Sequence, residues 1–163
     1  MILKNLDKSF LINLSLIFII FLLDRISKIY VIYLDNKFFG SEIFFSKYLN
    51  ITLIWNEGIA FGLLSFDEKF FYNVLTILIL VIILIIFFMI TKSDGFKKYS
   101  LLMILGGALG NVFDRIFYRA VPDFLDLHVG SFHWFIFNVA DIFITIGVLF
   151  MVVIELKNKN RNI

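Results

Sequence analysis

The chain has 163 residues, of which 61% are hydrophobic and 22 are phenylalanine. Soluble domains average about 45–50% apolar residues, so this composition leaves too little polar surface to face water and predicts a membrane protein. The formal net charge of +2 is too small and too dispersed to indicate nucleic-acid binding. The absence of cysteine excludes disulfides, thiol nucleophiles and thiolate metal ligands.

Four apolar segments predict an all-α membrane protein with four transmembrane helices in one domain, residues 1–163. The clearest segment is 70–90, which carries no charged residue. The hydrocarbon core of a bilayer needs about 20 apolar residues in helical form, so this segment is long enough to cross once. The other three segments are interrupted by polar residues. The expected spans are about 10–34, 70–90, 99–118 and 134–155.

Lysine and arginine predict the orientation of these spans. Basic residues gather before the first span, between the second and third, and after the fourth: Lys4, Lys8, Lys92, Lys97, Lys98, Lys157, Lys159 and Arg161. With four spans these segments share one side, which the positive-inside rule makes the cytoplasm. Both termini are then cytoplasmic. The loops 35–69 and 119–133 lie outside, where we expect a small β element.

The polar residues of the spans fall near one depth. The first span leaves the membrane near Asp24–Lys28, and the third leaves near Asp114–Arg115. The fourth, beginning at Trp134, reaches Asp141 after seven residues, or about 10 Å at the helical rise. Intramembrane ionisable residues are costly and indicate function, so this layer predicts a site near the outer membrane surface.

Two groups of candidate residues have plain alternatives. Asp24 and Lys28 are four residues apart in the order that favours a helical ion pair. An interfacial pair, with Lys28 reaching the headgroups, explains them as well as a role near the site does. In the sequence NEGIAFG, Asn56 offers a donor and an acceptor, and Gly58 permits tight backbone geometry. A simple turn near the membrane surface is the local alternative.

The third span contains the sequence GGALGNVFDR. Gly106 and Gly110 form a small-residue face that lets another helix approach closely. Asn111, Asp114 and Arg115 follow at spacings of three and four, which allows them to share a helical face. The alternative is a packing face topped by a satisfied ion pair, and we expect both to hold.

Two further aspartates differ in what their surroundings imply. A loop aspartate such as Asp123 is normally solvated, whereas Asp141 lies in an apolar segment with no basic residue within one turn. Asp141 must therefore be protonated or face a partner from another segment. Asn138, three residues earlier, shares its helical face. His128 and His133 are expected to be interfacial residues rather than metal ligands.

Five stretches, taken in order, resemble the lipoprotein signal peptidase family, also called signal peptidase II. They are DRISK at 24–28, NEGIAF at 56–61, GGALGNVFDR at 106–115, VPDF at 121–124 and FNVAD at 137–141. Each stretch alone is weakly or moderately specific. Their order across the whole chain, together with four expected spans, makes the resemblance specific.

The resemblance implies that Asp123 and Asp141 are the catalytic aspartates. It also implies a group of residues that shape the site or position substrate: Asp24, Lys28, Asn56, Gly58, Asn111, Asp114, Arg115 and Asn138. One departure is visible, because many relatives have proline before the FN pair, whereas this chain reads HWFIFN with Phe135 in that region. The departure bears on the start of the fourth span and leaves the aspartates unaffected.

The activity implied is that of an aspartic endopeptidase that removes the signal peptide from diacylglyceryl-modified bacterial prolipoproteins. Cleavage would fall on the N-terminal side of the lipid-bearing cysteine. The expected setting is the bacterial inner membrane, with the active site near the extracytoplasmic face and membrane lipids around it. We expect a monomer that uses no cofactor and no metal.

Three other classes of protein remain as alternatives. A proton-coupled transporter also uses intramembrane carboxylates, but it would need polar residues along the whole membrane depth. A structural or assembly protein would explain the glycine face but not the convergence of two aspartates and two asparagines. A metalloprotease is disfavoured because the two histidines do not form an HExxH motif.

Overall fold

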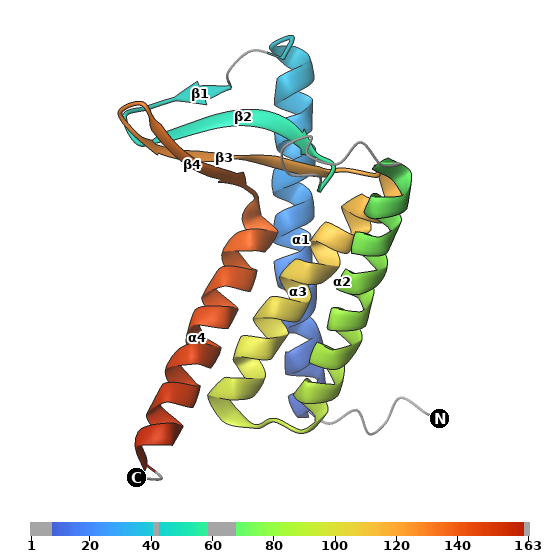
Figure 1. Cartoon of the computed structure of the whole chain (residues 1–163), viewed down its shortest axis with the longest axis vertical. Helices are drawn as coiled ribbons and strands as arrows, with labels where there is room; N and C mark the ends of the chain where they lie inside the picture. Colours follow the sequence, from blue (N-terminus) through green and yellow to red (C-terminus); the bar gives the residue numbers. More distant parts are fainter. Residues whose placement is uncertain (1–7, 41–42, 59–67, 162–163) are drawn as a thin grey trace.

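The computed structural model describes residues 8–40, 43–58 and 68–161, which form four helices and four strands (Figure 1). The elements are α1 (Lys8–Lys37), β1 (Phe44–Phe45), β2 (Leu49–Asn56), α2 (Glu68–Thr91), α3 (Gly95–Phe117), β3 (Val121–Val129), β4 (Phe132–Phe137) and α4 (Val139–Arg161). The described part therefore contains the four helices that the apolar segments predict, each long and apolar enough to cross a membrane.

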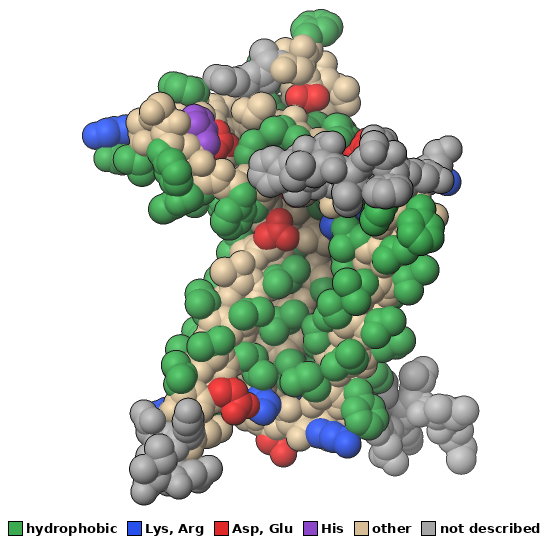
Figure 2. All heavy atoms as spheres, in the orientation of Figure 1, with side chains coloured by type: hydrophobic (Ala, Val, Ile, Leu, Met, Phe, Trp, Pro, Cys, Tyr) green, Lys and Arg blue, Asp and Glu red, His purple; other side chains and the backbone are tan. Residues whose placement is uncertain are grey.

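Helix α3 lies at the centre of the bundle and packs against α1, α2 and α4. Its buried leucines, Leu101, Leu102 and Leu105, form a core with Ile83 and Ile86 of α2. Figure 2 shows hydrophobic side chains spread over the outside of the helices, with charged side chains mainly near the two ends of the molecule. An apolar outer surface of this kind suits contact with lipid rather than water.

Glycines of α3 let two helices approach it closely. A Cβ atom on Gly110 would lie 2.5 Å from Asp24 Oδ2, and one on Gly106 would lie 3.0 Å from Ile20 Cβ, both on α1. On the neighbouring face, a Cβ on Gly107 would lie 2.5 Å from the Ala140 carbonyl oxygen of α4. The small-residue face predicted from Gly106 and Gly110 is confirmed as the contact with α1.

The strands form one antiparallel sheet in the order β1-β2-β3-β4, which lies across one end of the bundle (Figure 1). The expectation of a small β element is therefore confirmed. In the pairing of β2 with β3, Ile54 lies opposite Asp123, and Asn56 lies opposite Val121. Asn56 is thus the diagonal neighbour of Asp123 on one face of the sheet, within reach of its side chain.

The ends of the helices differ from those expected. The fourth span does not begin at 134, because Trp134 belongs to β4 and α4 begins at Val139. An aromatic-rich apolar run is compatible with strand or helix, and here pairing with β3 decides for a strand. Asp141 therefore lies in the first turn of α4 rather than about 10 Å along a helix. Helix α1 also runs beyond the expected 10–34, from Lys8 to Lys37.

The start of α1, the turn between α2 and α3, and the end of α4 all lie at the end of the bundle opposite the sheet (Figure 1). This is the arrangement that the distribution of lysine and arginine predicts for segments on one side of a membrane. The sheet and the polar residues beneath it lie at the other end.

Candidate active site

Asp123 and Asp141 are brought together by Asn138, which hydrogen-bonds to both. Asn138 Nδ2 donates to Asp123 Oδ1 at 2.6 Å, and the Asn138 backbone N–H donates to Asp141 Oδ2 at 3.1 Å. Strand β3 carries the first aspartate and the first turn of α4 carries the second. Both carboxyls line a single cavity.

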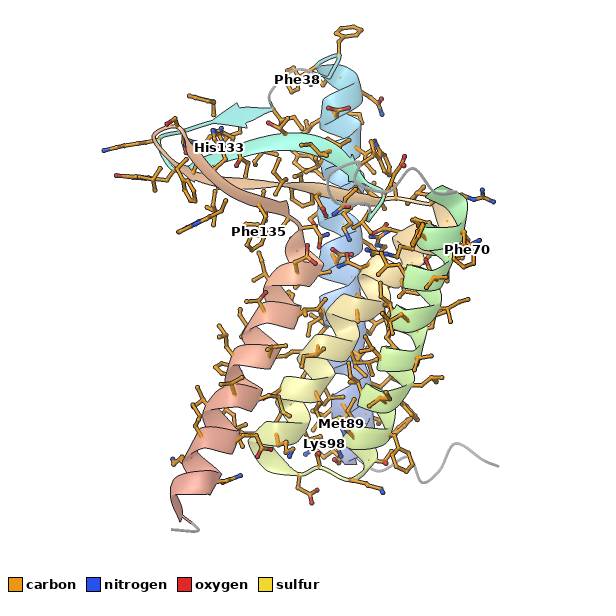
Figure 3. All side chains as sticks on the ribbon, in the orientation of Figure 1. Phe38, Phe70, Met89, Lys98, His133 and Phe135 are labelled. Carbon is orange, nitrogen blue, oxygen red and sulfur yellow. The ribbon has the colours of Figure 1, made fainter. Side chains whose placement is uncertain are left out.

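This cavity lies where the sheet meets the start of α4, and its volume is about 390 Å³. Figure 3 shows Phe135 at this junction, near the end of β4. Figure 2 shows an acidic side chain exposed in the hollow between the sheet and the helices. The lining residues are Asn56, Asp123, Phe135, Ile136, Phe137, Asp141, Ile144 and Thr145. The cavity therefore combines an apolar wall with two carboxyls, one amide and one hydroxyl.

Local sequence fixes the direction of the Asp141 side chain. Asn138 immediately precedes α4, and its Oδ1 accepts a hydrogen bond from the Asp141 N–H at 3.1 Å. Since Asp141 Oδ2 accepts from the Asn138 N–H in return, the two residues form a reciprocal capping box. The N-terminus of a helix also carries a partial positive charge, and Asp141 lies in the first turn of α4. The pattern of asparagine followed three residues later by aspartate is a sequence signal for this cap.

Asn111 holds the other oxygen of Asp141. Its Nδ2 donates to Asp141 Oδ1 at 2.8 Å. Its Oδ1 accepts from Lys28 Nζ at 2.9 Å and from Asn138 Nδ2 at 3.1 Å. Because the lysine ammonium can only donate, it requires the amide oxygen of Asn111 to face it and so turns the amide nitrogen toward Asp141.

Asp123 is buried, with 4% of its surface exposed. Asn56 Nδ2 donates to its Oδ2 at 2.8 Å. Burial raises the pKa of Asp123, the nearby Asp141 raises it further, and the amide donors of Asn56 and Asn138 partly oppose this rise. Asn56 Oδ1 also accepts the N–H of Gly58 at 2.8 Å, in a turn where Gly58 has a φ of +78° that suits glycine.

Beneath the cavity, two carboxylates and two cations form a buried network. The predicted pair of Asp24 and Lys28 is confirmed, with Nζ 2.9 Å from Oδ2. Asp114 Oδ2 accepts from Lys28 Nζ at 2.7 Å and from Arg25 Nη2 at 2.7 Å. Asp24 Oδ1 accepts the backbone N–H of Ala140 at 3.0 Å, so α1 is tied to the first turn of α4.

The three candidate site residues of α3, Asn111, Asp114 and Arg115, do not all contact the same group of residues. Asn111 and Asp114 point into the polar centre, but the described partners of Asp114 in ion pairs are Arg25 and Lys28. Arg115 instead lies toward the turn after β2, with Nη2 3.8 Å from where a Cβ on Gly58 would be. Arg25 was not among the expected site residues. Its adjacency to Asp24 on α1 is the sequence signal that could have indicated it.

The two histidines form a separate polar cluster in the sheet, where His133 is labelled in Figure 3. Their rings stack with centroids 4.9 Å apart. His133 Nδ1 lies 2.8 Å from Asp126 Oδ2, and His128 Nε2 lies 3.1 Å from Asn50 Oδ1. His128 is buried within the protein. Within the described residues, no group of three His, Cys, Asp or Glu is placed to hold a metal ion.

The chain is similar in sequence to lipoprotein signal peptidases. A family model described as signal peptidase (SPase) II matches residues 16–157. The lipoprotein signal peptidase of Pelagibacter ubique (strain HTCC1062) is 50% identical over 157 residues, covering 95% of each chain. That of Anaplasma phagocytophilum (strain HZ) is 37% identical over 153 residues, which cover 93% of this chain and 96% of the relative.

Two solved structures of bacterial membrane enzymes share the fold of this chain. A bacterial membrane enzyme determined by the in meso method at 2.3 Å superposes with a TM-score of 0.69 and 29% identity, covering 91% of this chain and 90% of that chain. A second, at 1.9 Å, superposes with a TM-score of 0.68. These neighbours and the four apolar helices identify a multi-pass membrane protein. Since the family model spans most of the sequence, the chain belongs to the signal peptidase II family.

Proposed function

We propose that the chain is an aspartic endopeptidase that removes the signal peptide from diacylglyceryl-modified bacterial prolipoproteins. In this proposal the enzyme cuts on the N-terminal side of the lipid-bearing cysteine. The observation that carries the proposal is that Asp123 and Asp141 line one cavity and are bridged by Asn138. The names of the curated relatives support the class of substrate.

Two neighbouring carboxyls supply a base and an acid because they do not readily ionise together. We assign the base to Asp141, since the helix N-terminus and two hydrogen-bond donors favour its charged form. We assign the shared proton to Asp123, whose raised pKa favours the protonated form.

Asp141 removes a proton from a water molecule, which attacks the scissile carbonyl, while Asp123 donates its proton to the carbonyl oxygen. Collapse of the tetrahedral intermediate breaks the C–N bond. The proton taken up by Asp141 passes to the leaving amine, and Asp123 recovers its proton from the hydroxyl that re-forms the carbonyl. No covalent acyl-enzyme is required.

The location of the cavity supports a lipid-anchored substrate. It lies at the end of four apolar helices, under the sheet. A diacylglyceryl group in the bilayer would hold the neighbouring peptide bond at this level. We place the enzyme in the bacterial inner membrane with the sheet and cavity at the extracytoplasmic face, because the lysine-rich ends lie opposite.

A proton-coupled transporter fits the described core less well. The half of the bundle away from the sheet contains an aliphatic core of Leu101, Leu102, Ile83 and Ile86. A proton path through the membrane would need polar groups or water at that depth. The described carboxyl, amide and ammonium groups of the site gather instead beneath the sheet.

The test is cleavage of a diacylglyceryl-modified prolipoprotein, followed by gel shift, with wild type, Asp123→Asn and Asp141→Asn. Each variant is first shown to be folded in detergent by thermal unfolding. We expect both variants to lose at least about three orders of magnitude in kcat, because neither acid nor base can be replaced by an amide.

Asp126→Asn is the matched control. Asp126 lies on β3, as Asp123 does, and is also buried. It pairs with His133 and does not line the cavity. It should retain activity. Near-normal turnover by either dyad variant contradicts the assignment. Loss of wild-type activity in a metal chelator would favour a metalloprotease instead.

A further inference from the structure

The buried network beneath the cavity contains a cation that is not part of the cavity wall. Arg25 is 7% exposed and does not line the cavity. Its Nη2 donates to Asp114 Oδ2 at 2.7 Å and to Asp24 Oδ2 at 3.0 Å, while Nη1 lies 2.5 Å from Asp114 Oδ1. The guanidinium therefore forms a charge-assisted hydrogen bond to Oδ2 of Asp114 and lies within ion-pair distance of its Oδ1.

Arg25 makes the network electrically neutral. Asp24 and Asp114 are fully buried, and Lys28 is 1% exposed. The two carboxylates would carry one uncompensated negative charge if Lys28 were the sole cation. Charges that are taken out of water are tolerated only when they are paired. With Arg25 the network holds two positive and two negative groups.

The neutral network reaches the proposed dyad through one lysine. Lys28 Nζ uses its three hydrogens on Asp24, Asp114 and the amide oxygen of Asn111. The bond from Lys28 sets the orientation of the Asn111 amide, whose Nδ2 then donates to Asp141 Oδ1. If two carboxylates competed for Lys28 alone, they would draw the ammonium away from the neutral amide, because a charged acceptor binds it more strongly.

We infer that Arg25 is a positioning residue for the proposed reaction: by neutralising Asp24 and Asp114, it lets Lys28 hold Asn111 in the orientation that orders Asp141. The inference rests on the proposed aspartic dyad. Among the residues that the structure describes, the charged partners of Arg25 are Asp24 from α1 and Asp114 from α3, and Lys28 pairs with the same two carboxylates. From Lys28 the hydrogen-bond chain continues through Asn111 to Asp141 of α4. Asn111 also accepts from Asn138, which donates to Asp123 of β3.

The test compares Arg25→Gln and Arg25→Lys with wild type in prolipoprotein cleavage across pH. Removing the positive charge leaves a buried negative charge near the dyad, so both limbs of the kcat profile should move to higher pH by about half a unit to one unit. We expect kcat at neutral pH to fall about tenfold or more with KM nearly unchanged, because Arg25 does not line the cavity. Arg25→Lys keeps the charge and should restore the position of the profile.

Two further variants complete the design. Lys97→Gln removes an exposed cation that pairs with Glu155 far from the site, and its profile should match wild type. If Arg25→Gln does not fold, Asp114→Asn alone is compared with the double variant Arg25→Gln/Asp114→Asn. The single variant leaves an excess positive charge and should shift the profile to lower pH. The double variant is neutral again and should shift it back.

An unshifted profile in Arg25→Gln, or coincident profiles of Asp114→Asn and the double variant, would overturn the inference. A loss of kcat without a shift, unrescued by lysine, would mean that Arg25 is merely structural. Asp123→Asn and Asp141→Asn are assayed in parallel. Their inactivity together with an unshifted Arg25→Gln rejects the positioning role alone, whereas their activity rejects the proposed dyad itself.

Discussion

Every polar atom of the Asn138 side chain has a hydrogen-bond partner at the site. Its Oδ1 accepts the Asp141 N–H, and its Nδ2 donates to Asp123 Oδ1 and to Asn111 Oδ1. An aspartate at this position could accept the Asp141 N–H but could not donate to Asp123, and a leucine could neither accept nor donate a hydrogen bond. The side chain is fully buried, so loss of any of these bonds would leave an unsatisfied polar group away from water.

The raised pKa of Asp123 predicts a pH-dependent contribution to stability. Because folding raises this pKa above its ordinary value of 3.8, the folded state binds the proton more tightly than the unfolded state does. The stabilising contribution is fully present below pH 3.8 and is lost as pH rises through the raised pKa. Asp123→Asn cannot ionise, so its Tm relative to wild type should increase over this window.

Thermal unfolding in detergent from about pH 4 to about pH 7 measures this difference. Wild type and variant are compared in the same buffers, so the titration of groups that do not interact with Asp123 cancels. A Tm difference that stays constant across the window, or decreases with pH, would contradict the raised pKa.

At the scale of the helix, the start of α4 combines a structural cap with the proposed catalytic machinery. Asn138→Ser keeps a side-chain oxygen for the Asp141 N–H but removes the amide donor to Asp123. Asn138→Ala removes both. We expect Asn138→Ser to be more stable than Asn138→Ala by about 1 kcal/mol, the usual contribution of an N-cap. Both should lose most of their kcat. Equal stability of the two, measured by unfolding in detergent, would show that the cap contributes nothing.

The close contacts of α3 with α1 and α4 depend on three glycines of α3, which are Gly106, Gly107 and Gly110. Alanine is intrinsically better than glycine in a helix by about 1 kcal/mol, so any loss of stability must come from packing. Gly110→Ala would push a methyl against Asp24 Oδ2, and Gly107→Ala against the Ala140 carbonyl. We expect each to lose about 1–3 kcal/mol of unfolding free energy, as for overpacking in a core.

Gly106→Ala serves as the graded comparison, since its Cβ would lie 3.0 Å from the Ile20 side chain and a small shift would relieve the contact. It should lose less than the other two variants. If thermal unfolding finds all three as stable as wild type, α3 does not pack as closely as described.

At the scale of the whole molecule, four apolar helices carry a sheet at one end, and lysine-rich segments lie at the other (Figure 1). The chain has no cysteine, so single cysteines can report the proposed orientation. Lys47→Cys, exposed on the sheet side, should react with a membrane-impermeant maleimide in intact spheroplasts. Lys92→Cys, exposed at the turn between α2 and α3, should react only after permeabilisation. The reverse pattern would invert the orientation.

Much of this organisation could be predicted from the sequence. Long apolar runs determine membrane-spanning helices locally, because each backbone polar group must be satisfied within the helix. The spacing of Asp24 and Lys28 likewise predicts an ion pair within one helix, and Gly106 and Gly110 predict a close helix contact. The short spacing in FNVAD predicts that Asn138 lies beside Asp141, and these two residues do form reciprocal hydrogen bonds.

Other features depend on contacts between segments that are distant in the chain. The start of α4 at Val139 depends on the pairing of β4 with β3, which an apolar pattern does not specify. Arg25 and Asp114 are 89 residues apart, and their ion pair exists only because glycines bring α1 against α3. The sequence by itself determined the four helices and which acids are costly to bury. Tertiary packing alone decided which partners satisfy them, because hydrogen bonds and ion pairs depend on distances that sequence spacing does not set between separate segments.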